Sequence, residues 1–214
     1  MSTTDQALLQ QLQYAVIEAP DGGQSWLSGL WTRDEVLAVA NQQQDRVIFD
    51  TGVVATTAFL VMSAGDALVA LPTNWLRTLA VLWSGADGSL RELQRGDSFE
   101  TDQAIPTWQT TGATPLVYME DDHPGSLIVR IAPAPDVAGG ITLFYVRNAV
   151  NTPLTGNGVA LILPDELAHA VKYATLARLL SKDGRGRDPA RAAYCQQRVD
   201  LATQATDLIL KGWS

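Results

Sequence analysis

The spacing of the hydrophobic residues changes twice along this chain. After Thr32 they recur every three or four residues, over 115–150 they alternate, and from Pro164 they return to the helical spacing. Helices and strands bury one face with periods of about 3.6 and 2 residues, so each segment fits only one of the two patterns. The order predicts an α+β fold. We expect a helical bundle, made of an N-terminal helix and a C-terminal helical hairpin, with a central antiparallel β-meander or small β-sandwich.

The first of these helices should begin directly after Thr32. Thr32 as N-cap and Glu35 three residues later form a capping box. The polar run 42–46 interrupts its apolar face, and a second apolar segment, 53–62, ends at "SAGD". We therefore expect helices over 30–66. The face toward the core should carry Val36, Val39 or Ala40, Gln43, Val47 and Thr51.

The middle of the chain has the signals of short strands. "TLAVLWSGADGSLRELQ" predicts two strands around a Gly-Ala-Asp-Gly turn. Three more strand segments follow, "PLVYMED", "SLIVRIAPAP" and "GITLFYVRNAV", with the turns "DHPG" and "DVAGG" between them. Alternation places one set of side chains on a buried face: Leu127, Val129, Ile131, Ile141, Leu143 and Tyr145. Consecutive strands with short turns predict the antiparallel meander.

The C-terminal part is predicted to be a helical hairpin. Its first helix has an apolar face of Leu167, Val171, Ala174 and Leu180, and "KDGRGRDP" breaks it. Asp188 and Pro189 are suited to the N-cap and first position of a second helix, which Gly212 would end. That helix should bury the stripe Tyr194, Leu201, Ala205 and Leu208. We expect Leu201→Asp to unfold the protein by burying an unpaired charge.

These elements divide the chain into an N-terminal extension, 1–29, and a single domain, 30–214. Within the domain we expect helices over 30–66, a β-rich part over 67–150, a loop over 151–163, the hairpin over 164–211 and a tail over 212–214. The extension and the tail carry Trp26 and Trp213 on segments with little capacity to fold alone. We expect both termini to become ordered by docking on a partner.

Composition narrows the class of protein. The 214 residues are 46% hydrophobic and 18% charged, which is typical of a folded globular chain. No apolar run reaches the roughly 20 residues that span a bilayer, and the start lacks the regions of a signal peptide. A single cysteine excludes an intramolecular disulfide and fits a reducing compartment. The formal net charge of -8 argues against a protein that grips nucleic acid, although DNA could still move past its surface.

One sequence pattern points to metal. Glu166 and His169 form Glu-x-x-His, half of the site found in di-iron helical bundles. The other histidine, His123, lies in a predicted turn, so one chain cannot assemble the second half. Glu166 also suits the first turn of a helix, where the dipole favours a carboxylate. We therefore predict no metal site, and "EDDHPG" is interpreted as a turn rather than a calcium or zinc loop.

No catalytic site is predicted either. Cys195 falls within an amphipathic helix, a poor place for a reactive thiolate, and is interpreted as a small core or interface residue. The chain contains no G-x-S-x-G, phosphate-binding loop or G-x-G-x-x-G pattern. We therefore expect no catalytic residues and no cofactor.

Two features are typical of interfaces, each with an ordinary alternative. Lys182, Arg185, Arg187 and Arg191 are the densest basic cluster of an acidic chain. They form either a solvated loop or a contact with an acidic stretch of a neighbouring subunit, such as 120–122. The six tryptophans are either interface anchors or core residues. We take Trp26, Trp213 and the basic cluster as the candidate interface residues.

In their order along the chain, several segments resemble the head-tail adaptor (head-completion) proteins of tailed bacteriophages. They are "TRDEVLAVANQQQDRVI", "LPTNWLRTLAVLWSGADGSLREL", "TPLVYMEDDHPGSLIVRIAPAPDVAGGITLFYVR", "LPDELAHAVKYATLARLL" and "DPARAAYCQQRV". The most specific pieces are "PLVY", the proline-broken strand "IAPAPD", and "KYA" followed by Arg-Asp-Pro-x-x-Ala. The resemblance covers about Leu30 to Leu201 and leaves out 1–29.

The resemblance implies a structural protein of the virion neck that joins the portal to the tail. It implies a homo-oligomeric ring, typically of twelve subunits, docked on the portal protein and receiving a tail nozzle or tail-tube protein. Genomic double-stranded DNA would pass through its lumen, without sequence-specific binding, during DNA packaging and ejection. Such a connector is assembled in the host cytoplasm and involves no membrane.

A second function stays open. A β-meander with exposed aromatic side chains could be a carbohydrate- or receptor-binding module of a phage tail. Trp75, Trp83 or Trp108 would then stack on sugars. An enzyme is a third possibility, which no motif of the sequence supports.

Overall fold

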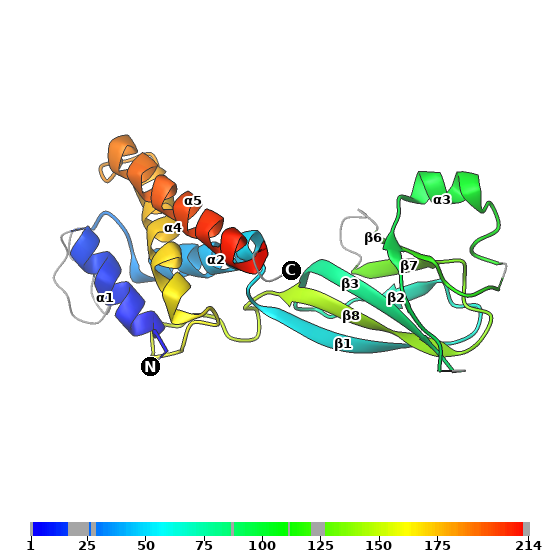
Figure 1. Ribbon diagram of the computed structural model, residues 1–214. Coiled ribbons are helices and arrows are strands. Elements are labelled where there is room, and N and C mark those ends of the chain that lie inside the picture. Colours follow the sequence, from blue (N-terminus) through cyan, green and yellow to red (C-terminus); the bar gives the residue numbers. More distant parts are fainter. Residues whose placement is uncertain are drawn as a thin grey trace. The chain divides into compact units, whose positions relative to one another are not determined.

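The computed structural model describes residues 2–16, 26, 29–86, 88–110, 112–120 and 127–211. The chain forms two compact units, one of residues 1–54 and 148–214 and one of residues 55–147, where the sequence suggested a single domain from residue 30. Figure 1 shows helices in the first unit and mainly strands in the second. The predicted α+β class and the order helix, strand, helix are confirmed.

Helix α2 (Arg33–Thr51) begins as predicted. The Thr32 side chain accepts a hydrogen bond from the Glu35 backbone N–H at 3.2 Å. The buried face includes Val36, Val47 and Thr51. Part of the polar run 42–46 also lies on the buried face, because Gln43 and Gln44 are buried. Both amide atoms of Gln44 lack a hydrogen-bond partner among the described residues.

The predicted helix over 30–66 is correct only as far as Thr51. Gly52 adopts φ 68°, a left-handed conformation that ends a helix and suits a residue without a Cβ. The segment that follows is strand β1 (Ala55–Met62). Thr56, Thr57 and Val61 of this strand are branched at Cβ, which favours the extended backbone of a sheet over a helix.

Residues 2–16 are not a separate extension, because they are packed into the helical unit. Helix α1 (Asp5–Ala15) begins after the N-cap Thr4 and buries Leu8, Leu9 and Leu12. Thr4 pairs with Ala160 as an antiparallel bridge. The predicted lack of folding capacity is therefore wrong for this part of 1–29, since an apolar face and backbone pairing both tie it to the fold.

The buried carboxylate of Asp5 ties α1 to the segment 148–163. It accepts hydrogen bonds from the backbone N–H groups of Thr155 at 2.8 Å, Gly156 at 2.6 Å and Gly158 at 2.8 Å. Side chains of α2 bind the same segment. Asn41 donates to and accepts from the Leu154 backbone, at 3.0 and 2.8 Å. The predicted loop thus lacks regular structure but is held by side chains from two helices.

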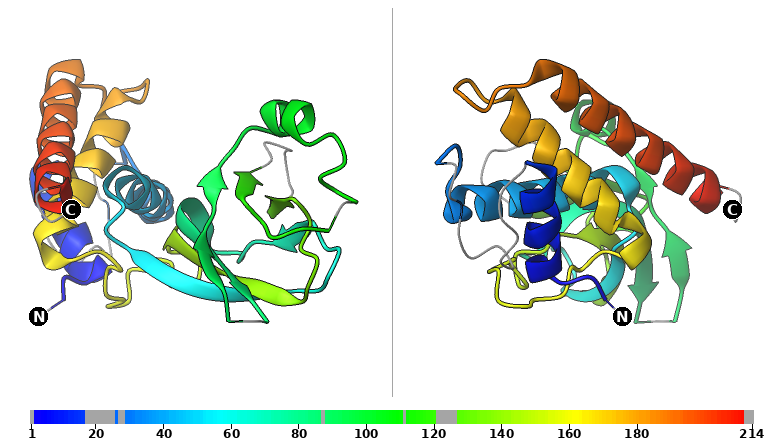
Figure 2. Two further views of the ribbon diagram at one scale, coloured as in Figure 1. Left: turned by 45° about the vertical axis from the view of Figure 1, so that its right-hand side comes forward. Right: turned by 90° about the vertical axis from the view of Figure 1, so that its left-hand side faces the viewer.

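The C-terminal residues form the predicted hairpin. After the short 3-10 helix η1 (Asp165–Leu167), α4 (Ala168–Ser181) and α5 (Pro189–Lys211) pack against each other (Figure 2). Asp188 caps α5 by accepting from the Arg191 N–H at 3.0 Å. Trp31 packs closely against Gly186 in the connecting loop, where a Cβ would meet its ring at 2.6 Å.

The predicted buried stripe of α5 is wrong. Tyr194 is 49% exposed, Leu201 50% and Leu208 74%. The helix instead buries a neighbouring face of mainly small residues: Ala192, Cys195, Val199, Ala202 and Thr206. Small side chains let helices approach closely, so these residues, and not the larger ones expected from the sequence, form the contact of α5 with its own unit.

The strand unit contains two four-stranded sheets. One has the order β1, β8 (Gly139–Arg147), β3 (Trp75–Gly85), β4 (Leu90–Glu92). The other has the order β2 (Leu68–Ala70), β7 (Ile128–Ala132), β6 (Val117–Glu120), β5 (Gln94–Arg95). The short helix α3 (Ser98–Ala104) follows β5. The predicted hairpin around Gly85–Gly88 is present as the antiparallel pair β3 and β4.

The predicted three-stranded meander is wrong in its last step. Strands β6 and β7 pair in one sheet, whereas β8 lies between β1 and β3 in the other. Both sheets contribute to one core, which includes Trp83, Val129, Ile131, Ile141 and Leu143. The small β-sandwich, which the sequence predicted as the alternative to a meander, describes this arrangement. After "IAPAPD" the chain passes from one sheet to the other.

Candidate functional site: an apolar groove between α4 and α5

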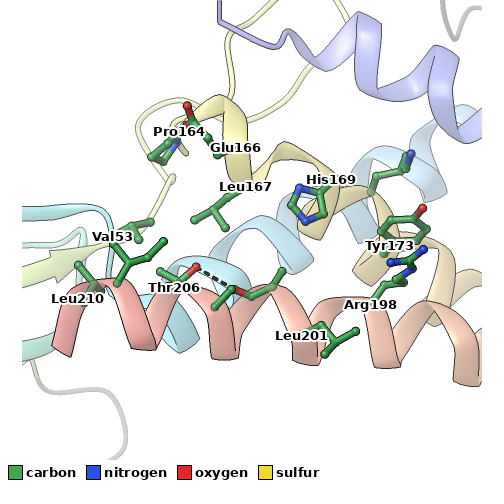
Figure 3. Close-up of a pocket in the computed structure, with 14 residues that line it drawn as sticks. Val53, Pro164, Glu166, Leu167, His169, Tyr173, Arg198, Leu201, Thr206 and Leu210 are labelled. Atoms are coloured by element: carbon green, nitrogen blue, oxygen red, sulfur yellow. Dashed lines mark hydrogen bonds between the residues drawn. The ribbon is translucent and has the colours of Figure 1, made fainter. Parts of the chain in front are cut away.

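A groove with a volume of about 800 Å³ lies between α4 and α5 in the helical unit. Figure 3 shows Leu167 facing α5 across it, with Val53 and Leu210 at one end. Its apolar lining includes Val53, Leu167, Leu201, Ala205, Ile209 and Leu210. Volumes of this size are typical of binding sites.

Charged and aromatic side chains occupy the rim of this groove. Glu166 lies near Pro164, and Tyr173 and Arg198 lie at the opposite end (Figure 3). The Arg198 Nε donates to the Tyr194 hydroxyl at 2.9 Å, and its guanidinium lies 5.3 Å from the centre of that ring. The hydrogen bond to the Tyr194 hydroxyl raises the pKa of Arg198 above its ordinary value, so the side chain stays charged.

A second cation lies at the same end. The Lys172 ammonium is 4.8 Å from the centre of the Tyr173 ring, and Tyr173 meets Tyr194 edge to face with ring centres 6.3 Å apart. No carboxylate of the described residues forms an ion pair with Lys172 or Arg198. This end of the groove therefore combines aromatic rings with two unneutralised positive charges.

Glu166 and His169, the predicted partial metal motif, both line this groove. Among the residues that the structure describes, no three His, Cys, Asp or Glu side chains are close enough to hold a metal ion. Cys195 is buried in α5, and desolvation raises the pKa of its thiol. A buried protonated thiol is a core residue, which is one of the two roles that the sequence predicted for Cys195.

The basic cluster at the hairpin loop is engaged mainly within its own unit. Lys182 forms an ion pair with Glu35, and Arg187 pairs with Asp183 at 3.1 Å. Arg191 donates to the backbone oxygen of Ala15. Exposed contacts of this kind contribute little to stability. Arg185 is exposed.

The acidic stretch 120–122, suggested as the partner of this cluster, is described only at Glu120. Its carboxylate binds Arg95 at 2.9 Å. Residues 121 and 122 lie outside the described part of the chain.

The tryptophans divide between core and surface. Trp31, Trp83 and Trp108 are buried, and the Trp75 indole donates to the Thr78 hydroxyl at 3.1 Å. Buried rings cannot stack on a sugar, which removes Trp83 and Trp108 as the proposed carbohydrate contacts. Trp26 is half-buried, and Trp213 lies outside the described residues.

The sequence model of the SU10 adaptor protein family matches residues 7–209, almost the whole chain. The chain belongs to the SU10 adaptor protein family. The match includes most of α1, so the resemblance extends further toward the N-terminus than the expected start at Leu30.

Other comparisons add little to this assignment. Among curated proteins, none is significantly similar to this adaptor protein. A chain of a solved structure described as "Neck of empty GTA particle computed with C6 symmetry" is 11% identical to it. The alignment covers 93% of this chain and 92% of that one, with a TM-score of 0.30, too low to support an argument about assembly.

Sequence reasoning missed the groove of this adaptor protein. Its walls come from η1, α4 and α5 together with Val53, and no local pattern joins these segments. One signal was available: apolar residues occupy more of α5 than a single contact face needs, since Cys195 and Val199 form one side and Leu201 and Ile209 another. Such a surplus indicates a second surface to cover.

Proposed function

We propose that this adaptor protein forms a ring in the neck of a tailed-phage virion, between the portal and the tail. The observation that carries the proposal is the family match over residues 7–209. The ring contains twelve copies of the chain and docks on the portal protein on one side. On the other side it receives a tail nozzle or tail-tube protein.

The proposed role is structural, with no catalytic activity, cofactor or membrane partner. Genomic double-stranded DNA passes through the lumen during packaging and ejection without sequence-specific binding. The net charge of -8 supports this part of the proposal, since a channel with few phosphate-binding cations lets DNA slide. Assembly takes place in the host cytoplasm.

Docking surfaces in this proposal include the predicted interface residues. Arg185 and its basic neighbours at the hairpin loop bind an acidic surface of a neighbouring subunit or of the portal. Trp26 and Trp213 act as aromatic anchors.

The proposal is tested by mixing the purified protein with portal rings and measuring mass. The expected product is a portal ring that has gained twelve chains of 23.0 kDa each. Arg185→Glu should weaken binding, whereas Arg91→Glu, a charge reversal on exposed strand β4, should leave it unchanged. Particle images that show the chain at a fibre tip and not in the neck would contradict the adaptor ring. They would favour the carbohydrate- or receptor-binding module.

A further inference from the structure

Helix α5 is apolar on two adjoining sides, and its own unit buries only one of them. Leu201 is 50% exposed, Leu208 74% and Ile209 63%, and the first and last of these line the groove. Exposed apolar side chains grouped along one groove indicate a surface that another molecule covers.

The charge at the groove limits what that molecule can be. Lys172 and Arg198 lie on the rim without a carboxylate partner among the described residues, in a chain of net charge -8. The fitting occupant is an apolar side chain that carries a carboxylate beside it. Its carboxylate would lie at the Arg198 end, away from Glu166 (Figure 3).

The chain itself presents such a feature on α3. Phe99 is 69% exposed, more than any other described aromatic side chain, and Glu100 follows it in the first turn. The turn is rigid, because the Asp97 carboxylate accepts hydrogen bonds from the N–H groups of both residues, at 2.8 and 3.3 Å. The Trp108 indole N–H, which donates to Asp102 at 2.6 Å, fixes the other end of this helix.

We propose that α3 of one copy docks in the α4–α5 groove of the next, with Phe99 among the apolar residues and Glu100 beside Lys172 and Arg198. The two surfaces belong to different parts of the chain, so the contact is head-to-tail. Each copy offers one groove and one α3, so successive copies can use both surfaces and close into a ring. The inference rests on the proposed ring and names its subunit contact.

Paired cysteines test this contact in the full chain. Cys195→Ala removes the native thiol, and Phe99→Cys with Leu201→Cys places one thiol on each surface. Oxidation should give linked dimers, trimers and longer species, because each copy carries both halves. Moving the second thiol to exposed Asp200, or the first to exposed Tyr14, should lower the dimer yield about tenfold. Equal yields, or a disulfide within single chains, would overturn the proposal.

Charge reversal gives a second readout, independent of where the thiols lie. In the double-cysteine chain, Lys172→Glu with Arg198→Glu should lower the linked dimer about fivefold, since two exposed ion pairs become repulsive. Adding Glu100→Lys should restore it. If the reversal has no effect, or if Glu100→Lys restores nothing, the proposed contact is wrong.

The portal assay separates this contact from the ring itself. A portal ring that gains twelve chains, none of which can be linked between Phe99→Cys and Leu201→Cys, would reject the contact and keep the proposed function. Head-to-tail linked chains that do not bind portal rings would keep the contact and reject the portal assignment.

Discussion

Helices α1 and α5 lie near the two ends of the chain and use their apolar residues differently. The three leucines of α1, Leu8, Leu9 and Leu12, are buried, and Asp5 fixes its first turn. Helix α5 buries small residues and leaves Leu201 and Leu208 exposed. The first helix thus belongs wholly to the fold, whereas the second both stabilises the fold and offers a surface for docking.

The difference shows that position near a terminus does not identify a docking element. The sequence suggested that residues 1–29 wait for a partner and that the large apolar stripe of α5 forms core. The structure packs residues 2–16 into the helical unit and leaves Leu201 and Leu208 of the α5 stripe exposed. What decides is whether a side chain finds partners within its own unit.

The largest expected effect separates the two faces of α5. Val199→Asp should destabilise the helical unit by about 4–5 kcal/mol, because Val199 is buried and the new charge has no partner. Leu201→Asp, two residues away, should change the free energy of unfolding by less than about 1 kcal/mol. Urea unfolding followed by circular dichroism measures both. If both variants lost the same free energy of unfolding, Leu201 would be a buried residue, as the sequence predicted.

The next effect concerns the attachment of α1. Asp5→Ala should cost about 3 kcal/mol, because three backbone N–H groups lose a charged acceptor. Asp5→Asn should cost less, since its amide oxygen can still accept. Asp34→Ala, at an exposed position in the first turn of α2, is the matched control. A melting temperature for Asp5→Ala equal to that of the control would show that the N-terminal residues are a dispensable extension.

A smaller effect of opposite sign is expected at Gln44. Its buried amide has no hydrogen-bond partner among the described residues, so Gln44→Met should stabilise the helical unit by about 1 kcal/mol. Gln42→Met, at an exposed position of the same helix, should have no comparable effect. Thermal unfolding of both variants checks this prediction, which a lower melting temperature for Gln44→Met would contradict.

The smallest effect is a pH dependence at the start of the chain. The Asp165 carboxylate accepts a hydrogen bond from the Thr3 backbone N–H, and this bond lowers the pKa of Asp165 below its ordinary value. A lowered pKa adds stability above the ordinary carboxyl value, and that stability is lost as the pH falls through the lower folded value. Melting temperatures of wild type and Asp165→Asn should therefore differ near pH 6 and converge in strong acid. A constant difference would show that the bond does not contribute.

Much of the architecture could be predicted because the signals are local. Thr32 and Asp188 cap helices as expected, and the alternation at Val129, Ile131 and Ile141 marks buried positions. Leu127, which was predicted to share this buried face, is 39% exposed. Strand pairing could not be predicted in the same way. The step that takes β8 away from β7 to lie between β1 and β3 depends on contacts far apart in the sequence.

The candidate site was less accessible from sequence than the fold. The basic residues of the hairpin loop were visible as a cluster, but their ion pairs with Glu35 and Asp183 needed the folded chain. In the sequence, Glu166 and His169 match half of a di-iron motif. In the structure, both line an apolar groove. Local spacing identifies residue types that could act together, and folding decides which of them meet.

The sequence by itself determined the α+β class, the starts of α2 and α5 and the family, because periodicity, caps and ordered segments are properties of neighbouring residues. Only the tertiary structure decided that α1 is part of the core, that 55–62 is a strand of the second unit and not a helix, and which side of α5 is buried. Each of those outcomes depends on packing. A helix with apolar residues on two sides can bury either one, and the shape of its neighbours, here with small residues at Ala192, Cys195 and Ala202, selects the side that fits closely.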